Sequence, residues 1–71
     1  MMSKRVKILI NEVKAKHGDP KYEWLSASTG ISMTSLWRIE NGMKEPTLSE
    51  LLLIAEALGV EYTELFTIVD Y

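Results

Sequence analysis

The sequence predicts a compact all-α domain of five helices, and three observations carry this prediction. Apolar residues recur at intervals of three and four along most of the chain, and residues that cap or stop helices stand at the ends of these stretches. No segment alternates strictly between apolar and polar residues, apart from a weak pattern over residues 67–69. Since a chain of 71 residues can build only one core, we expect a single domain over residues 1–71.

The first helix is expected over residues 4–16. Ser3 is a good N-cap, and Gly18 follows the segment as a stop because glycine readily adopts the left-handed conformation of a helix C-terminus. The apolar face of this helix consists of Val6, Leu9, Ile10 and Val13.

The next two helices are short. Asp19 as N-cap and Pro20 at the first helical position predict a helix over residues 20–28. After Gly30, Ser32 can cap a helix from Met33 to Glu40. Leu36 and Ile39 of this helix are expected to face inward.

The strongest helix signal follows a loop at residues 43–46. Thr47 and Glu50 form a capping box, and Gly59 marks the end of the helix, which we expect over residues 48–58. Residues 61–66 indicate a short fifth helix, and residues 67–71 form an unusually apolar tail. The apolar stripe of the fourth helix is Leu48, Leu51, Leu52, Ala55 and Leu58.

Composition excludes several classes of function. The chain has no cysteine and a single histidine, His17, so we expect no metal, no disulfide and no Cys- or Ser-His triad. No acid and base pair stands out, and we therefore expect neither an enzyme nor a cofactor nor a small-molecule ligand. No apolar run approaches the ~20 residues of a membrane span, and the N-terminus does not resemble a signal peptide, which predicts a cytoplasmic protein.

The net charge of -2 is unevenly distributed along the chain. Residues 1–44 hold all eight basic side chains and four acids, whereas residues 45–71 hold six acids and no base. Such a division suggests one face that attracts a polyanion and another that faces solvent or a partner. Charge alone does not decide the function, because two merely solvated faces would show the same division.

The segment most informative about function is residues 20–41. Two short predicted helices are joined there by the turn Thr29-Gly30-Ile31-Ser32. Because glycine permits a sharp turn, the second helix can cross the first and project outward into a DNA major groove, which is about 12 Å wide. This is helix-turn-helix geometry, and it makes residues 33–40 the candidate reading helix.

The reading helix belongs to an ordered set of short sequence motifs that continues through the chain. These motifs are Gly30-Ile31-Ser32, Leu36, Arg38-Ile39-Glu40-Asn41-Gly42, Pro46-Thr47-Leu48, Ile54-Ala55-Glu56-Ala57-Leu58-Gly59-Val60 and Glu64-Leu65-Phe66. With them the chain resembles, over nearly its whole length, the Cro and lambda-repressor-like regulators of the XRE family. The resemblance implies a lambda-repressor-like five-helix fold. It also implies a prokaryotic or phage-encoded, nucleoid-associated protein that binds double-stranded DNA at a palindromic operator as a homodimer.

The resemblance places the base-reading positions on Met33, Thr34 and Arg38, with Ser35 and Trp37 beside them. Arg38 can offer two donors to guanine, and Thr34 can reach a base or a phosphate. Met33 suits only a thymine methyl group or a sugar, and Trp37 suits the DNA backbone or a protein partner. The alternative for Arg38 is a surface ion pair with Glu40 or another neighbour.

Phosphate contacts are expected at the rims of the motif, from Lys21, Tyr22, Asn41 and Lys44. Tyr22 stands where the family commonly has glutamine, and the loop before it is one residue longer than usual. Simple solvation is therefore an equal alternative for Lys21 and Tyr22. The resemblance also implies a structural ion pair between Glu40 and Lys14 that holds the reading helix to the first helix.

Apolar residues beyond the needs of a small core suggest an interface. Ile68, Val69 and Tyr71 in the tail are assigned to dimerisation, which would set two reading helices about 34 Å apart, one turn of DNA. Trp24, Ile8 and Leu53 are further surplus apolar residues, and Trp24 can equally complete the core.

The sequence therefore predicts a sequence-specific transcriptional regulator, in particular a repressor. The alternative is a protein-interaction module on the same fold, such as an antirepressor or an antitoxin-like adaptor. Its anchors would be Trp37, Met33 and Trp24. The acidic overall balance favours this alternative, as does the lack of Asn and Gln on the reading helix, since these residues often read adenine.

Overall fold

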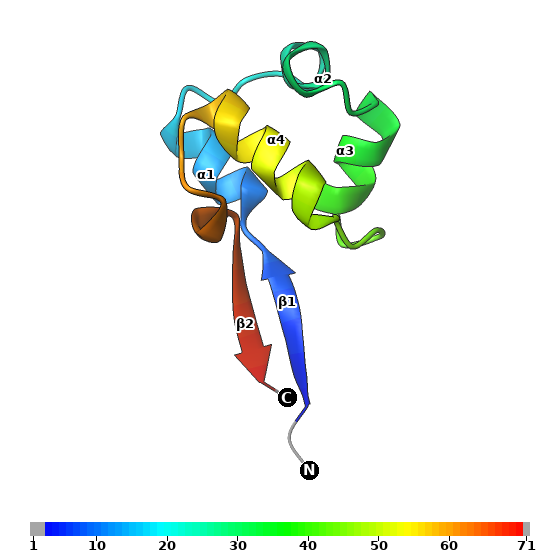
Figure 1. Cartoon of the computed structure of the whole chain (residues 1–71), viewed down its shortest axis with the longest axis vertical. Coiled ribbons are helices and arrows are strands. Elements are labelled where there is room, and N and C mark those ends of the chain that lie inside the picture. Colours follow the sequence, from blue (N-terminus) through cyan, green and yellow to red (C-terminus); the bar gives the residue numbers. More distant parts are fainter. Residues whose placement is uncertain (1–2, 71) are drawn as a thin grey trace.

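The structure is a computed structural model that describes residues 3–70. The described residues contain four α-helices, which form one body, and two strands, which project from it as a pair (Figure 1). β1 precedes the helices in the sequence and β2 follows them, so the whole helical body connects two strands that lie side by side. In chain order the elements are β1 (Lys4–Ile8), α1 (Ile10–Lys16), α2 (Tyr22–Thr29), α3 (Met33–Glu40), α4 (Leu48–Leu58), the 3-10 turn η1 (Tyr62–Leu65) and β2 (Phe66–Asp70).

The prediction of an all-α fold is wrong at both ends of the chain. Residues 4–8, expected to open the first helix behind a Ser3 cap, form β1, which runs antiparallel to β2 from Lys4 opposite Asp70 to Ile8 opposite Phe66. Residues 67–70 of the predicted tail belong to β2, and Tyr71 lies outside the described residues. Local periodicity missed this sheet because each strand is stabilised by a partner at the other end of the chain.

The starts of the first two helices also differ from the prediction. α1 begins at Ile10, and the preceding Leu9 donates its backbone N–H to the carbonyl of Leu65 over 2.8 Å. α2 begins at Tyr22, with Lys21 at the N-cap position, rather than behind Asp19. Since φ is positive at both Gly18 (86°) and Asp19 (47°), the chain is still turning at these residues and Pro20 falls in the loop.

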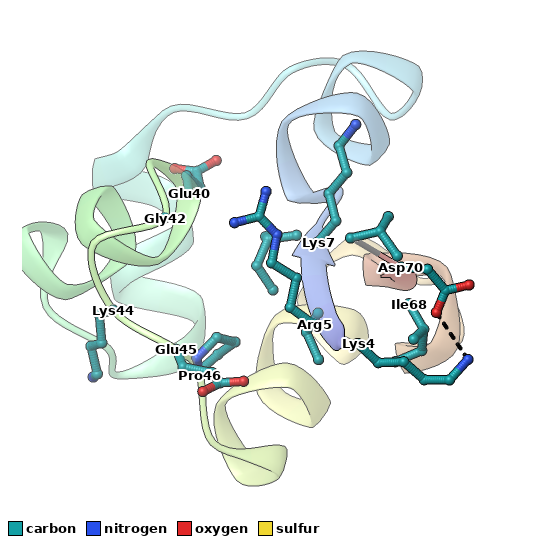
Figure 2. A pocket seen from close by; sticks show the side chains of 13 residues that line it. Lys4, Arg5, Lys7, Glu40, Gly42, Lys44, Glu45, Pro46, Ile68 and Asp70 are labelled. Atoms are coloured by element: carbon teal, nitrogen blue, oxygen red, sulfur yellow. Dashed lines mark ion pairs between the residues drawn. The ribbon is translucent and has the colours of Figure 1, made fainter. Parts of the chain in front are cut away.

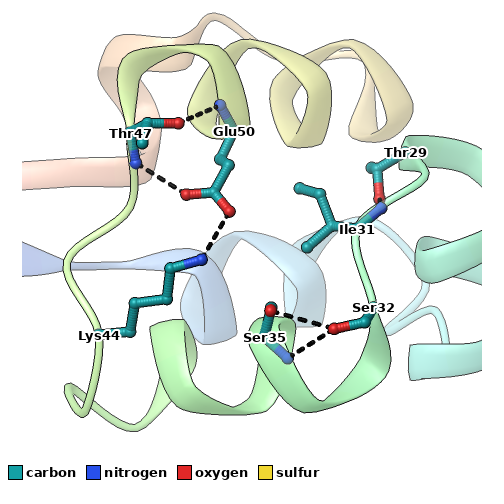
Figure 3. Close-up of polar contacts among 7 residues, drawn as sticks. All are labelled: Thr29, Ile31, Ser32, Ser35, Lys44, Thr47 and Glu50. Atoms are coloured by element: carbon teal, nitrogen blue, oxygen red, sulfur yellow. Dashed lines mark hydrogen bonds and ion pairs between the residues drawn. The ribbon is translucent and has the colours of Figure 1, made fainter.

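The bounds of α3 and α4 agree with the prediction, because their end signals are local. The Ser32 hydroxyl accepts the Ser35 N–H at 3.1 Å (Figure 3). Thr47 and Glu50 exchange the two hydrogen bonds of a capping box. The expected fifth helix over residues 61–66 is only one 3-10 turn, because the chain becomes extended at Phe66 and enters β2.

The core lies among the four helices and η1. Leu36 and Ile39 of α3 are fully buried, as predicted. Leu48 and Leu52 of the predicted apolar stripe are 59% and 48% exposed, because the face of α4 that packs on the core is formed by Leu51, Ile54, Ala55 and Leu58. The buried apolar residues are Ile10, Val13, Leu25, Ile31, Leu36, Ile39, Leu51, Ile54, Ala55, Leu58 and Leu65.

Candidate nucleic-acid interface

The turn between α2 and α3 is fixed by hydrogen bonds and by burial. The Thr29 hydroxyl donates to the carbonyl of Leu25 (2.7 Å) and accepts the N–H of Ile31 (3.1 Å, Figure 3). The Ser26 hydroxyl donates to the carbonyl of Ile31 (2.6 Å), and the Ile31 side chain is buried in the core. Gly30 lies between them with φ of 78°, a left-handed conformation that strains any residue with a Cβ. These contacts fix the angle at which α3 leaves α2.

The outward face of α3 carries the side chains that the sequence placed at base-reading positions. Met33 and Trp37 are 49% and 47% exposed, and Thr34 and Arg38 are exposed as well. The fifth position, Ser35, is only half-buried, and its hydroxyl accepts from the Ser32 hydroxyl at 3.0 Å. The structure therefore leaves four of these side chains open to solvent and engages Ser35 in the cap of its own helix.

Arg38 does not form the ion pair with Glu40 that was the alternative to base reading. The Glu40 carboxylate pairs instead with Lys14, whose Nζ lies 3.0 Å from Glu40 Oε1. Within residues 3–70, the Arg38 guanidinium forms no ion pair. The backbone carbonyl of Arg38 accepts the N–H groups of Met43 and Lys44, which ties the following loop to the helix.

The Lys14–Glu40 pair is buried between α1 and α3. Glu40 has a fully buried side chain, and the side chain of Lys14 is 7% exposed. Lys14 Nζ also lies 4.4 Å from the centre of the Tyr22 ring, close enough for a cation–π interaction. Charges removed from water to this degree are stable only when they are paired, so this cluster connects the first three helices at one point.

Tyr22 belongs to the same cluster. Its burial, together with the neighbouring Glu40 carboxylate, raises the pKa of Tyr22 to about 12. The phenol is therefore neutral at physiological pH, and its ring is partly committed to Lys14. Lys21, the other predicted phosphate contact at this rim, is exposed at the N-cap position of α2.

The two predicted phosphate contacts after α3 both have partners within the chain. The Asn41 side-chain amide donates to the carbonyl of Trp37 at 2.8 Å and so caps the end of α3. Lys44 Nζ lies 2.9 Å from Glu50 Oε2 (Figure 3), and this hydrogen bond, with a second one from the Thr47 backbone, lowers the pKa of Glu50. Lys44 remains partly exposed, so an incoming phosphate would compete with Glu50 for it.

Sequence reasoning missed the basic strand beside this loop. An open groove separates the strand pair from the loop after α3 (Figure 2). Arg5 extends from β1 toward Gly42, whereas Lys4 forms a 3.0 Å ion pair with Asp70 on the other side of the strand pair. Lys7 shares the face of Arg5, because alternate residues of a strand point the same way. The excess of basic residues over residues 1–44 was visible in the sequence, but the position of Arg5 and Lys7 beside the loop after α3 depends on the sheet.

Among residues 3–70, no helix has the length and apolar character needed to cross a membrane. Over the same residues, no group of three or more His, Asp or Glu side chains is arranged to hold a metal ion.

Comparison with known protein families identifies the fold of the segment around α3. Residues 23–65, more than half of the chain, match the model of a helix-turn-helix family. This match begins in α2 and ends in η1, so it includes the fixed turn, the outward face of α3 and the capped α4. No curated protein and no solved structure shows a significant match to the chain.

Proposed function

The chain belongs to the XRE-type helix-turn-helix family of DNA-binding transcription regulators, which includes Cro and lambda-repressor-like proteins, and we propose that it is a sequence-specific repressor. In this proposal α3 enters the major groove, Arg38 donates to guanine O6 and N7, and Thr34 contacts a neighbouring base or phosphate. Lys21 and Lys44 hold the DNA backbone on either side.

One observation carries this proposal: the orientation of α3 is fixed while its outward side chains are left open. The buried Lys14–Glu40 pair and the Thr29–Ile31 turn hold the helix from behind. Arg38 and Thr34 face solvent in front. A rigid helix with exposed donors on one face is what major-groove recognition requires, since a bidentate contact depends on the angle of approach.

Selection of bound sites from a random pool of double-stranded DNA tests the proposal. The experiment is run at about 50 and about 200 mM salt, because phosphate contacts make affinity fall steeply over this range. We expect enrichment of a palindromic site whose affinity falls with salt. Uniform weak binding to all sequences would contradict sequence-specific recognition.

A promoter reporter then tests repression. The selected site is placed so that it overlaps the promoter, where a bound domain would exclude the polymerase. We expect the wild-type chain to lower expression and the Arg38→Ala variant to lower it less. Increased expression with the wild-type chain would identify an activator instead.

We propose that the operator-bound form is a homodimer joined through β2. The pair of strands projects from the body, and both of its edges are unpaired within the described chain. An isolated two-stranded sheet is marginally stable in water, so a second copy that adds strands would stabilise it. Val6 and Ile68 lie opposite each other on one face and are 37% and 53% exposed.

Charge favours the β2 edge over the β1 edge as the site of pairing. If two copies paired antiparallel through β1, centred on Val6, Arg5 of each copy would lie opposite Lys7 of the other. Like charges that lie directly opposite each other destabilise a sheet. Self-pairing of β2 about Ile68 sets Thr67 opposite Val69 and creates no such pair. Basic residues on an edge strand are also a common protection against unwanted pairing.

Sedimentation at micromolar concentration tests the β2 interface. Ile68→Asp is expected to halve the mass of the wild-type dimer, because the two introduced carboxylates would face each other. Leu52→Asp, on the exposed face of α4, is the matched control and is expected to leave the dimer intact. Dissociation by Leu52→Asp alone would place the interface on α4 instead.

The second candidate function is a protein-interaction module. The specific observation that favours it is the exposure of three large apolar side chains, Trp24, Met33 and Trp37, each of which is about half exposed. This candidate predicts no enriched DNA site. It also predicts a partner protein whose binding is lost in Trp37→Ala.

A further inference from the structure

A shallow apolar depression lies between the first turn of α2 and the outward face of α3. It has a volume of about 330 Å³ and is lined by Tyr22, Glu23, Met33, Thr34 and Trp37. Both large α3 side chains at its walls are about half exposed. Exposed apolar side chains that gather around a hollow, with a few polar groups at its rim, are typical of a binding site.

We propose that this depression receives the C5-methyl group of a thymine in the major groove; the inference rests on the function proposed above. Thymine is the only unmodified base that presents an apolar group in the major groove, where its methyl group lies beside the O4 acceptor. Met33 and Trp37 supply apolar walls for the methyl group. Thr34, on the same depression, has a hydroxyl that can donate to O4.

The residues that α3 lacks support the same occupant. The helix has no Asn and no Gln, the side chains that read adenine through two hydrogen bonds. Without these side chains, α3 can still recognise an A·T pair through the apolar methyl group of thymine. Arg38 suits guanine, so the proposed helix reads a G·C pair with one side chain and an A·T pair with the depression.

Glu23 at the rim directs the depression toward a base edge rather than the DNA backbone. Its carboxylate would repel a phosphate, and it can accept from the N6 amino group of the adenine paired with the thymine. The depression is continuous with the outward face of α3, the face that is proposed above to enter the major groove.

Replacement of thymine by deoxyuridine in the selected operator tests this inference, because it removes the methyl group and keeps every hydrogen-bonding group. Replacing a single thymine in one half-site is expected to lower the affinity about fourfold, the value of one buried methyl group. Met33→Ala and Trp37→Ala are each expected to bind thymine and uracil operators within about twofold of each other. Met43→Ala, 67% exposed in the loop after α3, is the matched control and should keep the fourfold difference.

Each outcome decides the inference. Both test residues are half exposed, so the variants should unfold at a midpoint close to that of the wild-type chain, which ensures that a lost difference reflects the depression. Equal binding of thymine and uracil at every position would overturn the inference while leaving the proposed DNA recognition intact. Tighter binding to 5-methylcytosine, without any dependence on thymine, would overturn thymine as the occupant. Failure to select any site would instead contradict the proposed function itself.

Discussion

Removal of the buried charge at Lys14 is expected to destabilise the domain severely. Lys14→Met keeps most of the apolar stem but leaves the fully buried Glu40 carboxylate without its counter-charge at 3.0 Å. Breaking a buried pair from one side costs about 3 to 5 kcal/mol. A domain of 71 residues has a total stability of about 4 to 11 kcal/mol, so this single change removes a large part of it.

The free energy of unfolding is measured by urea denaturation monitored by circular dichroism. The same loss of free energy should lower the midpoint of thermal unfolding by roughly 12 to 40 °C. Lys4→Met is the matched control, because it removes an ion pair whose two side chains are 70% and 45% exposed. Its expected cost is about 0 to 1 kcal/mol.

A double variant separates the unpaired charge from lost packing. Lys14→Met combined with Glu40→Leu should recover most of the stability, because a well-packed apolar pair often replaces a buried ion pair without loss. The reasoning would be refuted if Lys14→Met cost no more than Lys4→Met. It would also be refuted if the double variant were no more stable than Lys14→Met alone.

Three further predictions concern the cluster, the loop and the turn. Since the folded pKa of Tyr22, about 12, lies above its ordinary value of 10.0, its contribution to stability should be complete below pH 10.0 and disappear as the pH rises through about 12. Absorbance titration of tyrosine should show a transition near pH 12 that is missing in Tyr22→Phe, and a transition that persists in this variant would belong to another tyrosine. Lys44→Ala should weaken binding to all DNA sequences alike and reduce the salt slope by about one phosphate; an effect confined to one base position would contradict a backbone role. Gly30→Ala should cost about 1 to 2 kcal/mol in urea unfolding, from backbone strain alone, because an added Cβ meets nothing within 4 Å; a much larger cost would indicate a steric clash in the turn.

The parts of the fold that could be predicted are those whose signals are local. The Ser32 cap, the Thr47–Glu50 capping box and Gly59 each act within a few residues, and α3 and α4 therefore have the predicted bounds. The N-terminal strand could not be predicted in the same way. Val6 fits the helical spacing of Leu9, Ile10 and Val13, and only its pairing with Ile68, at the far end of the chain, makes it part of a strand.

The same difference between local and long-range signals explains which parts of the candidate site could be predicted. The outward placement of Trp37 followed from the buried neighbours Leu36 and Ile39, which fix the helical face. The contact between Lys14 and Glu40 was expected only through the family resemblance, because no local pattern links α1 to α3. The basic face of β1 beside the α3–α4 loop and the depression between α2 and α3 depend on how whole elements pack, and sequence spacing does not encode that packing directly.

The measurement that tests the central claim most directly compares the base preferences of the wild-type chain and of Arg38→Ala over the selected operator. If α3 reads the major groove with Arg38, the variant should lose about 1 to 3 kcal/mol of binding free energy and relax its preference for guanine at one position in each half-site. All other positions should keep their preferences. A variant whose preferences match those of the wild type at every position would contradict the assignment of α3 and Arg38 as the reading element.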